Sequence, residues 1–218
     1  RGLGDVYKRQ VRYVVVFQNW LKPAGASFDH LHKQVVAIDE VGADNESVLP
    51  KAVLDPGIFN RWGPDFAVEH GLVLACNDGA VMTVGFGHRY PSVEVWSTSR
   101  VDQPWRVDDE GIDAVSDLLH AAHVAVSDDV PANEEWHYRP MGTGVPVPWR
   151  IILKLRTSTL AGFEGGTKIY VNTISPTTLA AMLLPKLFEA RAAGRIAAMN
   201  LGDECEIPRG VLAVTRER

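Results

Sequence analysis

The chain has 218 residues, of which 46% are hydrophobic and 22% are charged, enough for one large domain or two small ones with a packed core. Its formal net charge is −5 and no run of lysines or arginines is longer than a pair, so the composition predicts no nucleic-acid partner. No apolar run approaches the roughly 20 residues of a membrane span, and no signal-peptide pattern opens the chain. Cys76 and Cys205 lack the spacing of a disulfide framework or a zinc knuckle. Together these features predict a cytoplasmic protein that has no membrane partner.

The first ten residues, RGLGDVYKRQ, differ from the rest of the chain. They resemble a translated sequencing-adapter peptide, no methionine precedes them, and a strand pattern begins directly after them. We therefore interpret residues 1–10 as foreign to the protein and expect the natural sequence to start near Val11. We also expect the chain to be a fragment that lacks a part upstream.

Residues 11–70 begin with a short β-branched and aromatic run, VRYVVVFQNW (11–20), which predicts a buried strand. Pro23 and Gly25 interrupt the pattern in the next segment, LKPAGAS. The segment FDHLHKQVVAID (28–39) resumes an extended pattern, and residues 40–70 mix helix-compatible and loop-compatible stretches.

A second unit follows, with strand-like runs at 71–79, 80–87 and 92–99. The Asn-Asp-Gly tripeptide at 77–79 predicts a tight hairpin between the first two. Residues 108–129 are the clearest helix, because acidic residues suit its start and its apolar residues recur at helical spacing. That apolar stripe consists of Ile112, Val115, Leu118, Leu119, Ala122 and Val126.

The remaining elements complete the fold class. EEWHYRP (134–140) and WRIILKLRTS (149–158) predict two more strands, and GFEGGTKIYVNTISP (162–176) predicts a glycine-rich turn into a third. TTLAAMLLPKLFEARAAG (177–194) predicts an amphipathic helix that is bent or broken at Pro185. The order of strands and helices predicts an α+β fold.

Two histidines and a glutamine alternate in the segment HLHKQ. On an extended strand the side chains at i, i+2 and i+4 point to one face, so His30, His32 and Gln34 should lie side by side. Leu31 and Lys33 should point to the reverse face. A neutral imidazole is a good nucleophile toward phosphorus, and its adduct leaves readily once it is protonated.

Several polar groups are expected beside these histidines. The segment AGAS (24–27) is a loop of small residues whose backbone N–H groups can approach an anion closely, and Ser27 adds a hydroxyl donor. Asn19 ends the preceding strand and can hydrogen-bond into the same space. Such donors would hold phosphate oxygens as charge develops on them.

The spacing alone leaves two other interpretations open. A His-x-His pair on a strand is often a solvated or structural pair, and two histidines at i and i+2 can also share a metal ion. No third histidine, cysteine or carboxylate lies at convincing local spacing. His120 and His123, at i and i+3 on the predicted helix, are better explained as a polar helix surface than as metal ligands.

A longer motif around these histidines resembles the active-site segment of the galactose-1-phosphate uridylyltransferases, members of the histidine-triad superfamily. In that family a strand ending in Phe-x-Asn precedes a Gly-small-Ser loop and a His-Pro-His-x-Gln core. The match has no gap, and its residues are Asn19, Gly25, Ala26, Ser27, His30, His32 and Gln34.

The resemblance implies roles for these residues. His32 would attack the α-phosphate of a nucleoside-diphosphate sugar and carry the nucleotidyl group covalently, while His30 would orient the site. Gln34 would bind phosphoryl oxygens, and Asn19, Ser27 and their loop, Gly25 and Ala26 included, would assist at the phosphate. The partners implied are a nucleoside-diphosphate sugar and a sugar phosphate.

The resemblance also implies an architecture, an antiparallel sheet with flanking helices. Residues 11–70 would be the C-terminal part of a first histidine-triad-like lobe, and residues 71–218 a second such lobe. AGFEGGT (161–167) resembles a Gly-aromatic-Glu turn that helps to bind the sugar nucleotide, often across a homodimer interface, and Gly162 and Glu164 match it. No cofactor or metal ligand is assigned in this chain, although a longer protein would be expected to carry a structural zinc.

Three departures separate this chain from the family pattern. Leu31 replaces the usual proline, Phe28 and Asp29 replace polar and proline positions, and Ser158 stands where the family has a lysine, for which Lys154 or Arg156 would have to substitute. These changes leave two alternatives to a uridylyltransferase. One is a nucleotide phosphorylase or hydrolase of the same superfamily, and the other is a degenerate nucleotide-binding module.

Overall fold

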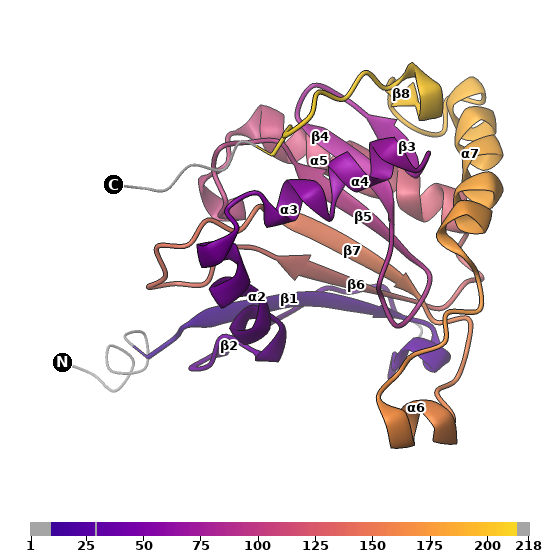
Figure 1. Cartoon of the computed structure of the whole chain (residues 1–218). Helices are drawn as coiled ribbons and strands as arrows, with labels where there is room; N and C mark the ends of the chain where they lie inside the picture. Colours follow the sequence, from indigo (N-terminus) through magenta and orange to yellow (C-terminus); the bar gives the residue numbers. More distant parts are fainter. Residues whose placement is uncertain (1–9, 29, 213–218) are drawn as a thin grey trace.

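The structure, a computed structural model, describes residues 10–28 and 30–212 (Figure 1). Residues 1–9 of the predicted foreign segment lie outside this description. The described part forms an α+β fold around one eight-stranded sheet in the order β2-β1-β6-β7-β5-β4-β3-β8, and every pair of neighbouring strands in it is antiparallel. The predicted fold class is confirmed.

The strands lie where the sequence patterns place most of them. They are β1 (Tyr13–Trp20), β2 (Gln34–Ile38), β3 (Val73–Cys76), β4 (Ala80–Gly85), β5 (Ser92–Ser97), β6 (Ala132–His137), β7 (Arg150–Leu155) and the short β8 (Asn200–Leu201). The helices are α2 (Ala43–Leu54), α3 (Ile58–Arg61), α4 (Pro64–Glu69), α5 (Asp109–Val126), α6 (Gly162–Thr167) and α7 (Pro176–Ala192), with 3-10 turns η1 (Lys22–Ala24), η2 (Pro104–Arg106) and η3 (Gly202–Glu204).

One sheet joins the two segments that the sequence suggested as separate lobes. Strand β1 pairs with β2 on one side and with β6 on the other, in the register Phe17↔Glu135 and Asn19↔Asn133. The strand that precedes the histidine motif is therefore hydrogen-bonded to the segment EEWHYRP. This pairing brings residues more than 100 positions apart in sequence into direct contact.

Helices α5 and α7 pack together on one face of the sheet and form the main core with it (Figure 1). The predicted stripe of α5 faces this core: Val115, Leu118, Ala122 and Val126 are buried, while Ile112 and Leu119 pack at its margin. Asp108 caps the helix, since its carboxylate accepts a hydrogen bond of 3.0 Å from the N–H of Gly111.

Helices α2 and α3 lie over the opposite face, where a smaller cluster surrounds Trp96. Gly63 is required at this contact, because a β-carbon there would come within 2.5 Å of the Phe59 carbonyl and 2.9 Å of the Trp96 ring. Asn133 and His137 of β6 and Arg150 and Lys154 of β7 face the same side of the sheet as Trp96, so this second layer shapes the candidate site.

Two predictions about the C-terminal half were wrong. Residues 162–167 form the short helix α6, and residues 168–174 are not a strand, since no neighbouring strand pairs with them among the described residues. Of the two outcomes expected at Pro185, a bend or a break, the break is wrong, because helix α7 continues through that residue. Proline removes one hydrogen bond, to the carbonyl of Ala181, but Ala181 is exposed to water and the flanking Leu183 and Leu187 are held in the core.

Candidate active site

The motif runs from Asn19, near the end of β1, through the connection to Gln34, the first residue of β2. After Trp20 the chain makes the 3-10 turn η1, and Gly25 follows it with φ 87°, a left-handed conformation that favours glycine. The predicted strand from residue 28 was too long: β2 begins only at Gln34, so both histidines precede it.

The side chains still alternate as the extended pattern predicted. The rings of His30 and His32 are stacked, with their centroids 6.0 Å apart and an angle of 23° between their planes. Leu31 and Lys33 instead line a cavity beside α5. Gln34 pairs with Phe17 across β1, so it shares the sheet face that carries Phe17, and the extended backbone puts His32 on the same side.

The backbone selects one nitrogen of His32. Its Nδ1 lies 2.7 Å from the carbonyl oxygen of His30, a contact in which the imidazole must donate. A proton on Nδ1 leaves the lone pair of the neutral ring on Nε2. His32 is only partly exposed, and Nε2 is therefore the nucleophilic atom that this geometry offers.

The loop of small residues is held by its own hydrogen bonds. The N–H of Gly25 donates to the carbonyl of Lys22 at 3.0 Å, and the N–H of Ala26 donates to that of Leu21 at 3.2 Å. Two of the backbone donors expected to meet an anion are thus engaged within the turn. The hydroxyl of Ser27, which is exposed, remains the predicted donor of this loop.

Asn133 and Arg156 together hold Asn19 in place, a connection that was not predicted from the sequence. The Nδ2 group of Asn133 donates to Oδ1 of Asn19 at 2.8 Å and to the carbonyl of Ala24 at 2.7 Å. Arg156 in turn donates to Oδ1 of Asn133 at 2.9 Å. The strand β1 and the turn that follows it are thereby tied to β6 and to the end of β7.

Lys33 anchors the motif from the reverse face of the sheet. Its ammonium is paired with the carboxylate of Glu134, which is fully buried and also accepts hydrogen bonds from His123 Nε2 at 3.0 Å and Trp136 Nε1 at 2.7 Å. Burial raises the pKa of Glu134, but the hydrogen bonds from His123, Lys33 and Trp136 outweigh it and bring the pKa down to about 2. Lys33, which lies between His32 and Gln34, is therefore held by the buried negative charge of Glu134.

This ion pair predicts a loss of stability in acid. The pKa of Glu134 lies below its ordinary value of 4.5, so its stabilisation is complete above about pH 4.5 and is lost as the pH falls toward 2. We expect the free energy of unfolding of the wild type to exceed that of Glu134→Gln at pH 6, and roughly 2 kcal/mol of this difference to vanish by pH 3. Urea unfolding at the two pH values measures it, and an unchanged difference would contradict the assignment.

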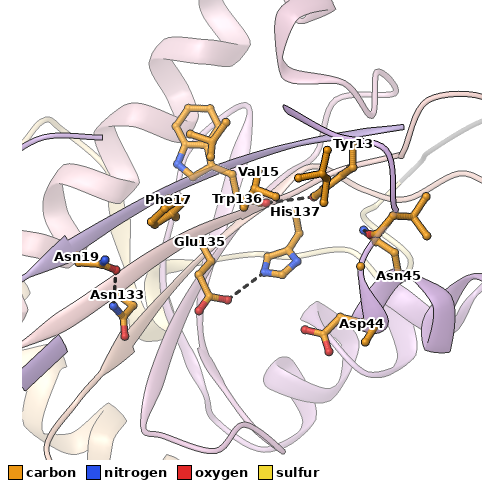
Figure 2. Close-up of a pocket in the computed structure, with 15 residues that line it drawn as sticks. Tyr13, Val15, Phe17, Asn19, Asp44, Asn45, Asn133, Glu135, Trp136 and His137 are labelled. Atoms are coloured by element: carbon orange, nitrogen blue, oxygen red, sulfur yellow. Dashed lines mark hydrogen bonds and ion pairs between the residues drawn. The ribbon is translucent and has the colours of Figure 1, made fainter. Parts of the chain in front are cut away.

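A cavity of about 510 Å³ opens on the face that carries Phe17 and Asn19 (Figure 2). Asn19 lines it, whereas His30, His32 and Gln34 do not. Its walls come from β1, from β6 and from the start of α2, where Asp44 and Asn45 lie. Glu135 and His137, two residues apart on β6, face into it and point toward each other, 3.5 Å between carboxylate and Nε2. The cavity thus combines an apolar floor with a few polar groups, as small-molecule sites do.

The charges on this face are largely paired with one another. Lys154 lies 2.6 Å from the carboxylate of Glu135. Burial raises the pKa of Glu135, but its contacts with His137 and Lys154 lower it to about 2, so the carboxylate stays ionised. Burial lowers the pKa of His137, which favours a neutral imidazole. The described residues bring together no group of three or more His, Cys, Asp or Glu that could hold a metal ion, so they do not provide the structural zinc site expected of a longer protein.

The two remaining predicted site residues, Gly162 and Glu164, lie in α6. This helix protrudes at the edge of the molecule (Figure 1), and Glu164 caps it by accepting a hydrogen bond of 3.0 Å from the N–H of Ala161. Among the described residues no hydrogen bond or ion pair joins α6 to His30, His32 or Gln34. The predicted residues from Asn19 to Gln34 thus follow one another along β1, the connection and the start of β2, whereas α6 lies outside this segment.

Asn133, Glu134 and Glu135 were not predicted from the sequence as residues of the candidate site. A signal for them exists, because the alternation in NEEWH places Asn133, Glu135 and His137 on one strand face and Glu134 on the other. This alternation does not show which strand lies beside β6. That β6 pairs with β1, more than 100 residues earlier in the sequence, is seen only in the folded structure.

The fold defines the class to which this structure belongs. An ADP-glucose phosphorylase from Arabidopsis thaliana, solved with bound ADP-glucose, is similar with a TM-score of 0.70 and 22% identity over 83% of this chain and 62% of its own. A galt-like protein from Arabidopsis thaliana gives 0.69 and 21% over 84% and 64%, and a uridylyltransferase mutant gives 0.68 and 18% over 86% and 67%. The fold is therefore that of the uridylyltransferase-like proteins, and the chain spans less than two thirds of the length of the first two.

The family follows from the sequence match. A family model described as a domain of unknown function, DUF4921, matches residues 1–214, and the chain belongs to this family. A comparison with curated proteins found no match. Among the residues that the structure describes, no helix is both long and apolar enough to cross a membrane.

Proposed function

We propose that this protein is a nucleotidyltransferase that acts on a nucleoside-diphosphate sugar through a covalent intermediate on His32. The observation that carries the proposal is the hydrogen bond between His32 Nδ1 and the His30 carbonyl, within a motif that matches the transferase pattern from Asn19 to Gln34 without a gap. It places a proton on Nδ1, so that Nε2 carries the ring lone pair for attack when the imidazole is neutral.

The reaction would proceed in two displacements. The Nε2 lone pair of His32 attacks the α-phosphorus, an N–P bond forms, and the P–O bond to the sugar phosphate breaks, so the sugar phosphate leaves. In this proposal Gln34, Ser27 and Asn19 donate hydrogen bonds to the phosphate oxygens as negative charge develops. An acceptor phosphate then attacks the same phosphorus, and the N–P bond breaks as the protonated imidazole leaves.

The acceptor separates the alternatives within the superfamily. A sugar phosphate would make the protein a uridylyltransferase-like enzyme, orthophosphate would make it a phosphorylase, and water a hydrolase. The similar structures include both a uridylyltransferase and an ADP-glucose phosphorylase, which supports testing both ADP- and UDP-sugars. The open cavity beside Asn19 has room for the sugar or its acceptor.

Labelling of the protein tests the proposal directly. The wild type is incubated with ADP-glucose and UDP-glucose that carry a radioactive α-phosphate, and the denatured protein is then assayed for label. We expect label that is stable in base, labile in acid and confined to the peptide containing His32, as a phosphoramidate requires. No label with either nucleotide sugar, together with measurable nucleotide binding, would instead indicate a degenerate nucleotide-binding module.

We also propose that the protein forms a homodimer through the segment around α6. Four apolar side chains of this segment are more than 40% exposed, although they lie close together in the sequence: Leu160, Phe163, Ile169 and Val171. Such a concentration of exposed apolar groups is typical of a protein interface. A second copy would cover them and would bring Gly162 and Glu164 close to a partner site.

Light scattering on a double variant checks the dimer. Phe163→Ser with Ile169→Ser is expected to convert a dimeric wild type to monomers, because it removes two of the four apolar contacts. Leu54→Ser is the matched control, since Leu54 is 87% exposed but lies on α2. A monomeric wild type, or a dimer that survives the double substitution, would refute this interface.

A further inference from the structure

Asn133 and Arg156 form a hydrogen-bonded chain that ends on Asn19. Nη1 of Arg156 donates to Oδ1 of Asn133, and Nδ2 of Asn133 donates to Oδ1 of Asn19 and to the carbonyl of Ala24. Figure 2 shows the two asparagines facing each other across β1 and β6. The donor and the acceptor of each of these hydrogen bonds are fixed, because the guanidinium of Arg156 can only donate.

That direction decides which atoms of Asn19 remain for a ligand. Since Arg156 must donate to Asn133, the carboxamide of Asn133 is turned so that its oxygen faces Arg156 and its nitrogen faces Asn19. The oxygen of Asn19 is consequently occupied, and its Nδ2 group faces the turn, where a β-carbon on Gly25 would lie 4.0 Å away. Asn19 therefore offers donors, and not an acceptor, to a phosphate.

Arg156 is itself held in place by an aromatic ring. Its guanidinium stacks over the Tyr90 ring at 4.5 Å, and among the described residues no Asp or Glu forms an ion pair with it. Its Nε is buried without a hydrogen-bond partner in the part of the chain that the structure describes. A buried donor left unpaired is costly, so the bond from Nη1 to Asn133 and the ring contact with Tyr90 must hold the guanidinium in this position.

We propose that Arg156 and Asn133 are positioning residues that set the carboxamide of Asn19 as a donor to the substrate phosphate. This inference rests on the proposed function, because it assigns the phosphate-binding role of Asn19. Arg156 acts through Asn133 and adds a positive charge near the phosphate. Neither residue needs to touch the reacting atoms.

The Asn133→Asp substitution tests the direction of the chain with almost no change in shape. The introduced carboxylate has no N–H to give, so Asn19 would turn its Nδ2 group toward it and present its oxygen to the phosphate. We expect the affinity for ADP, measured by calorimetry at pH 7.5, to fall about ten- to a hundredfold, the range expected for losing a hydrogen bond to a charged group. Arg156→Leu should cause a similar loss, and Arg156→Lys should recover much of it by restoring a charged donor.

Asn60→Asp is the matched control. Asn60 also uses both ends of its carboxamide, donating to the Leu212 carbonyl at 3.0 Å and accepting from the Leu212 N–H at 2.9 Å, but it lies on α3 and lines neither the cavity beside Asn19 nor the one beside Lys33. Its substitution should lower the melting temperature about as much as Asn133→Asp while leaving ADP affinity unchanged. The inference is overturned if the wild type binds no ADP, or if Asn133→Asp lowers the affinity for ADP no more than Asn60→Asp does. It is also overturned if Arg156→Lys binds ADP no more tightly than Arg156→Leu.

Binding of ADP needs no reaction at His32, so this experiment is independent of the labelling. Label on His32 with unchanged ADP affinity in Asn133→Asp would reject the positioning role but keep the transferase. If Asn133→Asp binds ADP more weakly but the wild type acquires no label on His32, the positioning role stands and the protein is a nucleotide-binding module. The two proposals can thus fail separately.

Discussion

His32→Ala is expected to abolish covalent labelling by α-labelled nucleotide sugars and to slow nucleotidyl transfer by at least about a thousandfold, since removing a nucleophile leaves only binding and electrostatic contributions. The physical reason is that Nδ1 of His32 contacts the carbonyl oxygen of His30, which leaves the lone pair of the neutral ring on Nε2. Single-turnover rates measured by rapid quench check this result. The substitution should leave the melting temperature nearly unchanged, because His32 is partly exposed and lies outside both core clusters.

His30→Ala serves as the comparison for this prediction. The group of His30 that holds Nδ1 of His32 is its backbone carbonyl, which alanine retains, so we expect only about a tenfold loss of rate, in the range of one lost hydrogen-bond or packing contact. The metal-site interpretation makes the opposite prediction. It requires that zinc or iron be bound in stoichiometric amount and that both substitutions release it and lose activity equally.

Glu134→Gln is expected to destabilise the protein by roughly 3 kcal/mol, because it removes a buried carboxylate that accepts three hydrogen bonds and leaves at least one of the donors unpaired. The side chain of Glu134 is 0% exposed and accepts hydrogen bonds from Lys33, His123 and Trp136. Glutamine has one acceptor oxygen and would turn its amide nitrogen toward one of these donors. Because Lys33 lies between His32 and Gln34, we also expect the labelling rate to fall in protein that is still folded at about 10 °C, a temperature near the usual maximum of protein stability.

Asp55→Asn is the matched control for Glu134→Gln. Asp55 pairs with Arg61 at 2.8 Å, but the arginine side chain is 62% exposed, so the loss should stay under about 1 kcal/mol. A double-mutant cycle with Lys33→Met isolates the contribution of the pair itself. If Glu134→Gln costs no more stability than Asp55→Asn, or if it leaves the labelling rate unchanged, the anchoring role of Lys33 is wrong.

Local patterns predicted most elements of this fold. The runs at 11–20, 80–87 and 149–158 are strands because β-branched and apolar residues pack well on a pleated, buried surface. The helix at 109–126 follows from a stripe at 3.6-residue spacing and a capping aspartate. These properties depend on neighbours within a few residues, so the sequence alone reveals them.

The wrong predictions arose where local pattern and tertiary context disagree. The segment KIYVN (168–172) has the composition of a strand, yet among the described residues no strand edge is paired with it and it remains irregular. The histidines at 30 and 32 were predicted on a strand, but β1 ends its pairing with β2 at Phe17↔Gln34, and so the strand begins two residues after His32. A strand exists only where a partner meets it, which a single segment cannot specify.

Sequence patterns were sufficient for the α+β class, the alternation of His30, His32 and Gln34, and the composition of the turn that precedes them. The folded structure was needed to show that β6 lies beside β1, and therefore that Asn133 meets Asn19 and that Glu134 reaches Lys33. The difference comes from the range of the forces involved. Periodicity and turn chemistry act over a few residues, whereas the hydrogen bonds and ion pairs that orient this motif join positions more than 100 residues apart.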